Sequence, residues 1–464
     1  MPWGELLTAS FATALITTLL LPAGTLLLGR AFARRSLNHF LRAQIKNTLV
    51  ELYSSLMSTP PLEGVNINLR AETGRPVERP MGSPKNFPGL DGLLFVPAQL
   101  ARLPTPEDVP VDLTTVIGPG ASRPLVLSLP VLVSGMAYGF ALSERAKLAI
   151  ARGTRLAGTA TNSGEGPLLP AERREAAKLV LQYNRGGWNR DPALLRQADM
   201  LEIQLAQGSE AAASRRKAAA DLPPRARRLL GLAPGQTALI HSRLPEMNRP
   251  ADLVPLVAWL RETAPGIPVG VKLCASDRLE EDLAWVLAAG ADAVTVDGAE
   301  AGTANAPVTV SDDFGLPLVY ALPRAARFLR EADPLRRVTL IASGGLRGPA
   351  DFLKVLALGA QAVAIGTAAL MAVSHGQITD ALPFEPPTAL VFADGDLAPR
   401  LDVERGARAL ANFLESCRQE LILAVRALGK TAIQAVDASD LCCLDPELAA
   451  LAEVRLATVP PRWA

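Results

Sequence analysis

The sequence predicts a (β/α)8 barrel, an α/β fold in which eight parallel strands alternate with helices. From about residue 124, short β-branched runs alternate with Ala/Leu/Arg-rich stretches of helical character. Glycine-containing turns follow the last two runs, where barrels of this kind commonly bind phosphate. The expected strands are Pro130–Met136, Leu156–Thr161, Leu179–Tyr183, Met200–Leu205, Val269–Leu273, Ala293–Asp297, Val338–Ala342 and Ala362–Ile365.

Two features bear on the topology. An apolar run at Ala238–His241 falls in the long stretch between the fourth and fifth strands, so we expect it in an insertion outside the barrel. A doubly wound open sheet is the alternative fold. It would require a glycine fingerprint after its first strand, and Ser134–Gly139 (SGMAYG) is not one.

The N-terminus predicts a membrane anchor. No charged residue occurs from Leu6 to Gly29, a length close to the ~20 apolar residues that span a bilayer. Arginines and a lysine follow at once, which by the positive-inside rule places the remainder in the cytoplasm. A single-pass membrane protein with a cytoplasmic catalytic domain is therefore expected. A buried helix and a signal peptide are the alternatives, and Met1–Glu5 lacks the positive charge of the latter.

The chain divides into a transmembrane anchor (1–30), a helix plus extended arm (31–123), the barrel (124–376) and a C-terminal helical extension (377–464). Apolar residues at helical spacing predict an amphipathic helix over 36–58. Residues 59–124 are predicted to form an extended arm or a linker, and the sequence leaves open whether they cover the active site. The extension contains a helix near Val403–Leu428 whose apolar stripe includes Cys417.

Composition limits the classes of function. The 464 residues carry 47 basic and 46 acidic side chains, so a nucleic-acid partner is not expected. The four cysteines contain no CxxC pair and no disulfide framework. The histidines, at positions 39, 241 and 375, are too scattered for a metal site, and His241 is either catalytic or a loop contact. A homo-oligomer is compatible with the sequence.

The glycine turns predict a phosphate site. One comprises Ser343, Gly344 and Gly345, with Arg347 two residues on, and the other is Gly366-Thr367. Glycine lets backbone N–H groups approach an anion, and the helix that follows adds a favourable dipole. The alternative is that these glycines only turn each strand into its helix.

Polar residues at other strand ends predict the rest of the site. Lys272 lies in an apolar strand and should meet an anion at the barrel mouth, because a buried unpaired lysine is costly. Glu165, in TNSGEG, is a candidate general acid–base or an ordinary loop carboxylate. Asn162 should lie at the barrel mouth after the second strand. Gln204 should reach inward from the fourth strand to the ligand, unless it is only a hydrogen-bonded polar group of the barrel interior.

These motifs together resemble the FMN-binding domain of the glutamate synthase family. The resemblance covers Pro130–Met371 and rests on SGMAYG, TNSGEGP, EIQLAQG, GVKL, DGAEAGTANAP, ASGGLR and AIGTAAL in this order. It implies FMN as the cofactor and the family reaction, in which 2-iminoglutarate is reduced to L-glutamate. It also implies that Lys272 lies near flavin N1 and that Glu165 lies near the imino carbon. The implied flavin platform and phosphate contacts are Ser134, Gly135, Met136, Ala137, Gly344, Gly345, Gly366 and Thr367.

The sequence departs from the family at several positions. We expect no glutamine-cleaving domain, and no iron–sulfur cluster is expected because the family's cysteine cluster after the eighth strand is absent from this sequence. Gln204 and Glu210 stand where the family has lysines, and Ala301 and Ala304 replace glycines. The flavin site therefore resembles the family pattern, whereas the 2-oxoglutarate site and the electron supply do not.

The sequence thus predicts an FMN-dependent oxidoreductase acting on an imino or amino acid, with Glu165 and Lys272 as catalytic residues and an unidentified electron donor. One alternative is oxidation of a 2-hydroxy acid, but Asp297–Asn305 lacks the histidine and arginine which that class requires. The other is a non-catalytic, membrane-bound flavoprotein.

Overall fold

The computed structural model describes the chain apart from residues 1–17, 19, 23, 39–48, 378–386 and 461–464. It consists of two compact units, Met1–Val77 and Glu78–Ala464. In the first unit, residues 18, 20–22 and 24–38 are helical, followed by α2 (Leu49–Ser58) and α3 (Pro61–Thr73). Helix α3 lies where an arm without helix was expected. It begins with proline at its first turn and ends at Gly74, whose positive φ of 61° suits a helix C-cap.

The structure contradicts the prediction of a single-pass membrane protein. Among the described residues, no helix is both long enough and apolar enough to cross a membrane. The helical residues 24–38 include the charged Arg30, Arg34 and Arg35. Most of the remaining predicted anchor, residues 1–17, 19 and 23, lies outside the described part of the chain.

The predicted barrel is confirmed in the second unit. Eight strands, all parallel, form one sheet in the order β5-β15-β14-β12-β11-β8-β7-β6. The N–H of Val133 donates to the carbonyl of Ala160 at 3.0 Å and links the two ends of the sheet. The strands are β5 (Val131–Val133), β6 (Thr161–Asn162), β7 (Leu179–Tyr183), β8 (Met200–Gln204), β11 (Val269–Cys274), β12 (Ala293–Asp297), β14 (Thr339–Ser343) and β15 (Ala362–Ile365).

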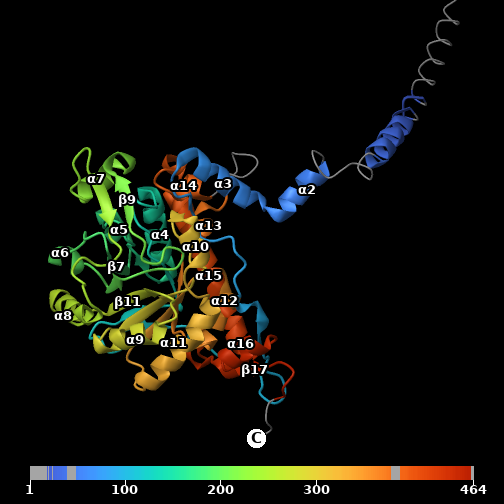
Figure 1. The fold of residues 1–464 in the computed structure, drawn as a ribbon. Coiled ribbons are helices and arrows are strands. Elements are labelled where there is room, and N and C mark those ends of the chain that lie inside the picture. Colours follow the sequence, from blue (N-terminus) through green and yellow to red (C-terminus); the bar gives the residue numbers. More distant parts are fainter. Residues whose placement is uncertain (1–17, 19, 23, 39–48, 378–386, 461–464) are drawn as a thin grey trace, which may run out of the picture. The chain divides into compact units, whose positions relative to one another are not determined.

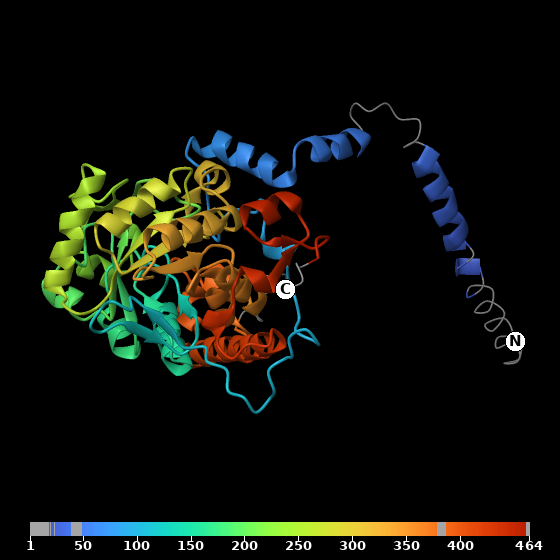
Figure 2. The same ribbon diagram turned by 90° about the horizontal axis from the view of Figure 1, so that it is seen from below.

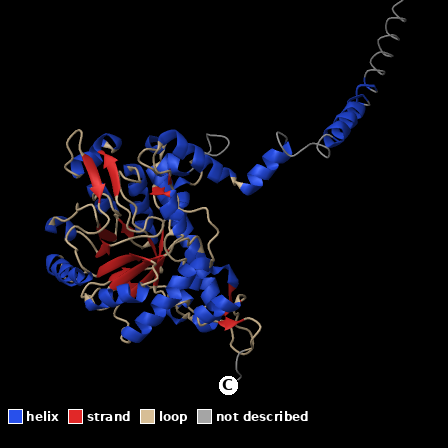
Figure 3. Cartoon of the chain, viewed as in Figure 1, coloured by secondary structure: helices blue, strands red, loops and turns tan. Residues whose placement is uncertain are grey.

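A helix follows each strand and covers the outside of the barrel, so strands lie inside and helices outside (Figures 1 and 3). The second strand starts later than predicted because helix α4 runs through Leu156 and ends at Gly158, which has a φ of 71°. The covering helices are α4 (Glu144–Ala157), α5 (Pro170–Glu175), α6 (Pro192–Leu195), α8 (Leu253–Thr263), α9 (Leu279–Ala288), α11 (Leu318–Ala332), α12 (Pro349–Ala357) and α13 (Thr367–Ser374).

Residues before the barrel close one of its ends. Strands β3 (Thr115–Ile117) and β4 (Leu125–Leu127) pair as an antiparallel hairpin. The buried side chains of Ile117, Leu125 and Leu127 join a cluster with Met200 and other residues of the barrel strands. Apolar burial thus fixes this part of the arm at the end of the barrel where the strands begin.

Residues 78–95 of the arm pair with other parts of the same unit. Strand β1 (Glu78–Arg79) pairs with β13 (Ala306–Pro307), which lies in the loop after β12. Strand β2 (Leu93–Phe95) pairs with β16 (Leu441–Cys443) in the C-terminal extension, and β17 (Arg455–Leu456) completes that small sheet.

The apolar run at Ala238–His241 lies in an insertion outside the barrel, as predicted, and the structure shows that this insertion forms a hairpin of its own. Strand β9 (Arg215–Ala218) pairs with β10 (Thr237–Ile240), and α7 (Pro224–Leu229) lies between them in the sequence. Helix α10 (Val308–Asp313) belongs to the loop after β12.

The predicted C-terminal helix is confirmed as α15 (Val403–Ala427), with α14 (Pro387–Val391) before it and α16 (Pro446–Leu451) after it. Helix α15 packs along α4, and both belong to the lower layer of helices in Figure 2. Contact is close at Gly153, where an added Cβ would meet the Ala407 carbonyl at 3.0 Å. Cys417 is buried on the apolar stripe of α15, which gives it a structural role.

Candidate functional site

A cavity opens where the carboxyl ends of the barrel strands meet the loops that follow them. Met81 of the arm also lines it, and its N–H donates to the carbonyl of Thr303 at 3.0 Å. The arm therefore forms part of the wall of the site. Of the predicted site residues, the cavity is lined by Ser134, Gly135, Met136, Ala137, Glu165, Lys272, Ser343, Gly344, Gly345, Arg347, Gly366 and Thr367.

The glycine turns at β14 and β15 have the backbone that an anion cradle needs. Gly344 and Gly345 have positive φ values of 116° and 69°, which favour glycine. An added Cβ on Gly345 would lie 2.9 Å from Cβ of Glu300, so the turn cannot admit a side chain without movement. At Gly366, directly before α13, an added Cβ would meet nothing within 4 Å and would project into open space beside the cavity.

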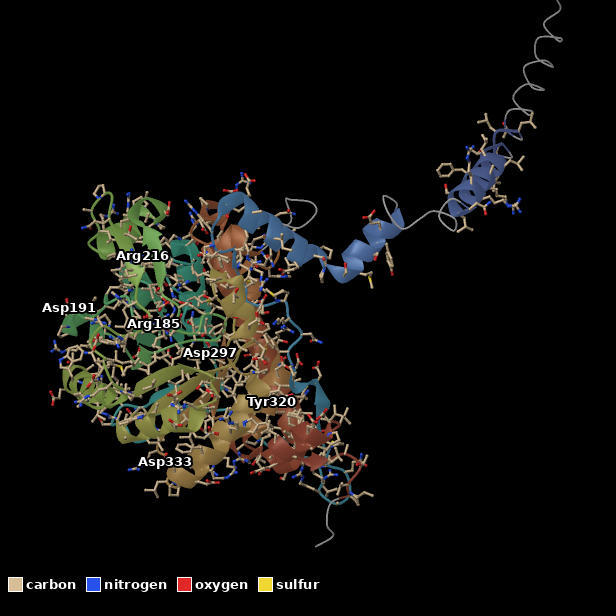
Figure 4. All side chains as sticks on the ribbon, in the orientation of Figure 1. Arg185, Asp191, Arg216, Asp297, Tyr320 and Asp333 are labelled. Atoms are coloured by element: carbon tan, nitrogen blue, oxygen red, sulfur yellow. The ribbon has the colours of Figure 1, made fainter. Side chains whose placement is uncertain are left out.

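Lys272 extends from β11 into the barrel mouth. Its side chain is 3% exposed, and its Nζ lies 3.3 Å from Oδ2 of Asp297 and 3.5 Å from the hydroxyl of Ser134. Burial alone would lower the pKa of Lys272, but the carboxylates of Asp297 and Glu202 outweigh it and raise that pKa. Lys272 is therefore a fixed positive charge at one wall of the cavity. Figure 4 labels Asp297 within the body of the barrel unit.

Asn162 and Gln204 are not among the residues that line the cavity. Gln204 donates through Nε2 to Oε1 of Gln207 at 3.4 Å, whereas Asn162 belongs to a buried network around Glu202. Oε1 of Glu202 accepts from Nδ2 of Asn162 at 2.8 Å and from Nε2 of Gln182 at 3.0 Å, while Oε2 accepts from the hydroxyl of Thr295 at 3.0 Å. The Asn162 carbonyl oxygen accepts from the Gly164 N–H at 2.9 Å. The network holds the loop of Glu165 in place.

Glu165 is part of a cluster of four charged residues, which we call the charge quartet: Glu165, Arg185, Glu210 and Arg215. Oε1 of Glu165 accepts from Arg185 Nη2 at 3.0 Å, and its Oε2 accepts from Arg215 Nη2 at 2.9 Å. Oε1 of Glu210 lies 3.0 Å from both guanidiniums. Burial would lower the pKa of Arg215, but Glu210 and Glu165 outweigh it and raise that pKa. Burial raises the pKa of Glu210, against the two arginines, which lower it. The quartet therefore places two carboxyl groups against two guanidinium groups.

Three members of the quartet were missing from the predicted site. Arg185 follows β7 by two residues, so the rule that barrel sites form at strand ends could have found it. Arg215 begins β9 of the insertion, and no spacing pattern ties an insertion to the site. Glu210 was noted only as a departure from the family.

Two other residues have environments that the sequence did not show. Glu300 lines the cavity, and burial raises its pKa to about 6, against hydrogen bonds from backbone N–H groups that lower it. His241, a catalytic candidate from sequence, is exposed and is not among the residues that line the cavity. Among the described residues, no group of His, Cys, Asp or Glu is arranged to hold a metal ion.

Fold and site together define a (β/α)8-barrel protein with a cavity, lined by glycine turns and a buried lysine, at the carboxyl ends of its strands. The chain belongs to the glutamate synthase family, since the model of the conserved region in glutamate synthase matches residues 104–431. The family resemblance inferred from the motifs is thereby confirmed.

Two relatives place the chain within this family. A glutamate synthase large subunit-like protein of Rhizobium meliloti (strain 1021) is 33% identical over 410 residues, which cover 84% of this chain and 92% of that relative. An archaeal-type glutamate synthase (NADPH) of Thermotoga sp. (strain RQ2) is 31% identical over 332 residues, which cover 71% of this chain but only 64% of that relative. A solved (S)-mandelate dehydrogenase chimera aligns with a TM-score of 0.49 at 17% identity, over 76% of this chain and 88% of that one, and nothing about the site follows from it.

Proposed function

We propose that this chain is an FMN-dependent oxidoreductase that transfers a hydride between flavin and the carbon of a carbon–nitrogen bond. The observation that carries the proposal is that the glycine turns after β14 and β15 and the buried Lys272 line the same cavity, in a chain of the glutamate synthase family. The proposal implies a small-molecule substrate and a separate electron donor.

The residues present fit FMN. Gly366 leaves open space where a phosphate would bind, and α13 directs its N-terminal dipole there, while Gly344 and Gly345 form the tight turn after β14. Arg347, which is exposed at the rim, adds a cation for the phosphate. Ser134 to Ala137 would support the ring, because they follow β5 and line the same cavity. Bound FMN would supply the two-electron acceptor for hydride transfer.

The roles of the protein side chains follow from their surroundings. Lys272 holds a positive charge in a water-poor wall, which would favour the reduced flavin by direct electrostatics. Both carboxylate oxygens of Glu165 accept from guanidinium groups. We therefore propose that Glu165 positions Arg215 and shapes the substrate side of the cavity, besides the acid–base role expected from sequence.

The test is a comparison of flavin binding and flavin reduction. FMN-loaded protein is mixed anaerobically with candidate amines, and bleaching of the flavin absorbance is followed by stopped flow. The proposal expects reduction by at least one amine class and a slower rate in Glu165→Gln with FMN binding kept. A flavin that no amine reduces, with Glu165→Gln identical to the parent, would favour the non-catalytic flavoprotein.

A further inference from the structure

Arg215 brings a positive charge to the cavity from the hairpin insertion rather than from a barrel strand. We infer that Arg215 binds the carboxylate of the substrate and that this carboxylate lies next to the reacting carbon–nitrogen bond, so that the substrate is a 2-amino or 2-imino acid. The inference rests on the proposed function, since it concerns the substrate side of the same cavity.

The two arginines of the charge quartet differ in how far they are enclosed. A guanidinium group has five N–H donors. Arg185 directs Nε and Nη2 at Glu165 and Nη1 at the Ala213 carbonyl, and its side chain is 0% exposed. Arg215 donates to Glu165 at 2.9 Å and to the Asn305 carbonyl at 3.4 Å, its Nε has no hydrogen-bond partner, and its side chain is 18% exposed. Arg215 therefore keeps donors for a ligand, whereas Arg185 serves the protein.

Glu210 affects how much positive charge the quartet presents. Its Oε1 lies 3.0 Å from Nη2 of Arg185 and 3.0 Å from Nε of Arg215. Its side chain is 0% exposed, and burial raises its pKa, which favours the neutral carboxylic acid. A neutral Glu210 leaves Glu165 as one anion against two guanidinium groups. An anion bound at Arg215 restores the balance.

The order of the barrel strands separates Arg215 from the phosphate turns. Its partners Glu165, Arg185 and Glu210 follow the neighbouring strands β6, β7 and β8. The glycine turns follow β14 and β15. Around the closed sheet, β8, β11 and β12 lie between β7 and β14 in one direction, and β6, β5 and β15 lie between them in the other. The quartet thus lies across the barrel mouth from the turn after β14, and the anion at Arg215 belongs to the substrate rather than to the cofactor phosphate.

The other cations of the cavity wall have surroundings of their own. Of the described residues that line the cavity, Lys272, Arg347 and Arg215 carry a positive charge. Lys272 lies 3.3 Å from Asp297, and Arg347 follows the glycine turn after β14. Arg215 is therefore the cation that is placed to receive a substrate carboxylate.

Glu165 indicates where the carboxylate lies in the substrate. Glu165 and Arg215 are in direct contact, and both line the cavity. Ligand groups that bind a cation and an anion in contact are themselves neighbours, and a carboxylate oxygen has lone pairs for a further donor. A nitrogen at Glu165 and a carboxylate at Arg215 are thus joined through one carbon, which is the carbon that exchanges the hydride in the proposed function.

The experiment uses pyruvate and pyruvamide, which differ in that a neutral amide replaces the carboxylate. Pyruvate is the smallest 2-oxo acid, so it tests the carboxylate contact without assuming the rest of the substrate. Both are titrated by calorimetry into the FMN-loaded full chain and into the chain without FMN. Pyruvate should bind about tenfold or more tightly than pyruvamide, because it adds a charge-assisted hydrogen bond. Equal or tighter binding of pyruvamide, or no binding of pyruvate, would overturn the inference.

Arg215→Met supplies the variant test. Affinity for pyruvate should fall about tenfold or more, whereas pyruvamide and FMN should bind as they do in the parent. Arg215→Lys keeps the charge and should recover part of the affinity. Arg216→Met is the matched control, because Arg216 is the next residue on β9, is exposed and is not among the residues that line the cavity (Figure 4).

The outcomes separate the inference from the proposed function. Equal pyruvate affinity in folded Arg215→Met and in the parent would overturn the inference and leave the flavin proposal standing. A loss of FMN affinity with pyruvate binding unchanged would also overturn it, since Arg215 would then bind the cofactor. A chain that holds no FMN but prefers pyruvate, and loses that preference in Arg215→Met, would keep the carboxylate site and remove the proposed function. If Arg215→Met does not fold, Arg215→Met/Glu210→Gln replaces it, because that pair removes one charge of each sign.

Discussion

Replacing Lys272 by methionine should destabilise the protein even without any ligand. The substitution keeps the length of the side chain and removes the charge that lies 3.3 Å from Asp297. At that distance and an effective dielectric of about 20, the Coulomb attraction is about 5 kcal/mol. Measurements on buried pairs that lose one partner give about 3–5 kcal/mol, so we expect a loss within that range.

Asp297 shows why the loss should be large. In the parent, one oxygen of Asp297 accepts from the Gly208 N–H at 3.0 Å, and its other oxygen has no hydrogen-bond partner among the described residues. Lys272→Met leaves that carboxylate buried and charged with one backbone donor. The double variant Lys272→Met/Asp297→Asn removes both charges and should recover most of the stability.

The assay is urea unfolding of the apoprotein, followed by circular dichroism at pH 7, for both single variants and the double variant. The pKa of Lys272 is raised above its usual 10.5, so its contribution is complete below that pH and is lost only as the pH rises through the higher folded value. The result should therefore be the same at pH 6 and pH 8. A loss below about 1 kcal/mol, typical of exposed pairs, would refute the buried fixed charge.

Three further predictions concern other parts of the site. Gly366→Ala should change the stability of the apoprotein by less than about 0.5 kcal/mol, because the new methyl group meets open space. It should weaken FMN binding about tenfold, because the methyl group obstructs the phosphate site. Equal FMN affinity of variant and parent in a fluorescence titration would contradict this. Glu300 has its pKa raised to about 6, so its contribution to stability, about 2 kcal/mol, is present below pH 4.5 and is lost as the pH rises through 6. In Glu300→Gln, the urea midpoint should therefore depend less on pH between pH 4 and 7. A pH dependence equal to that of the parent would count against this role of Glu300. Lys147→Met should lower the free energy of unfolding by about 3–5 kcal/mol, because the buried ammonium pairs with Glu172 at 2.8 Å and donates to the Met136 carbonyl at 2.9 Å. A thermal unfolding midpoint equal to that of the parent would show that this ion pair is not needed for stability.

The barrel could be predicted because each strand is short, apolar and followed by a helix with its own period. Strands β7, β12 and β15 have the expected bounds, and most of the others differ by a residue or two. The second strand was misplaced because the end of α4 has the same Ala/Leu composition as a strand, and only the αL glycine at 158 separates the two. Helix α3 was missed because its apolar residues show little helical periodicity.

The prediction of a membrane anchor was wrong for a different reason. Apolar composition fixes how many residues could span a bilayer, but it does not fix where a helix begins and ends. In the described part, the helix extends through Arg30, Arg34 and Arg35, which an apolar window that stops at Gly29 does not register.

The site was predictable where it follows the strands and not where it comes from the insertion. Glycine turns and Lys272 sit at strand ends, so sequence order alone brings them together. Arg215 reaches the cavity from β9, and its partners Arg185 and Glu165 come from loops after β7 and β6. Such a contact depends on how the insertion folds back, which no periodicity encodes. Asn162 and Gln204 were expected at the flavin and lie instead outside the cavity lining, because Asn162 bonds to Glu202 and Gln204 to Gln207.

The most direct test of the account is the identity of any cofactor in the purified full chain. The protein is purified, its absorbance spectrum is recorded, and released cofactor is identified after denaturation, with FMN added back to any apoprotein. The account predicts the two absorbance bands of an oxidised flavin and the release of FMN in a one-to-one ratio with the chain. A colourless protein that cannot be reconstituted with FMN would contradict the proposed oxidoreductase and leave the barrel without a redox function.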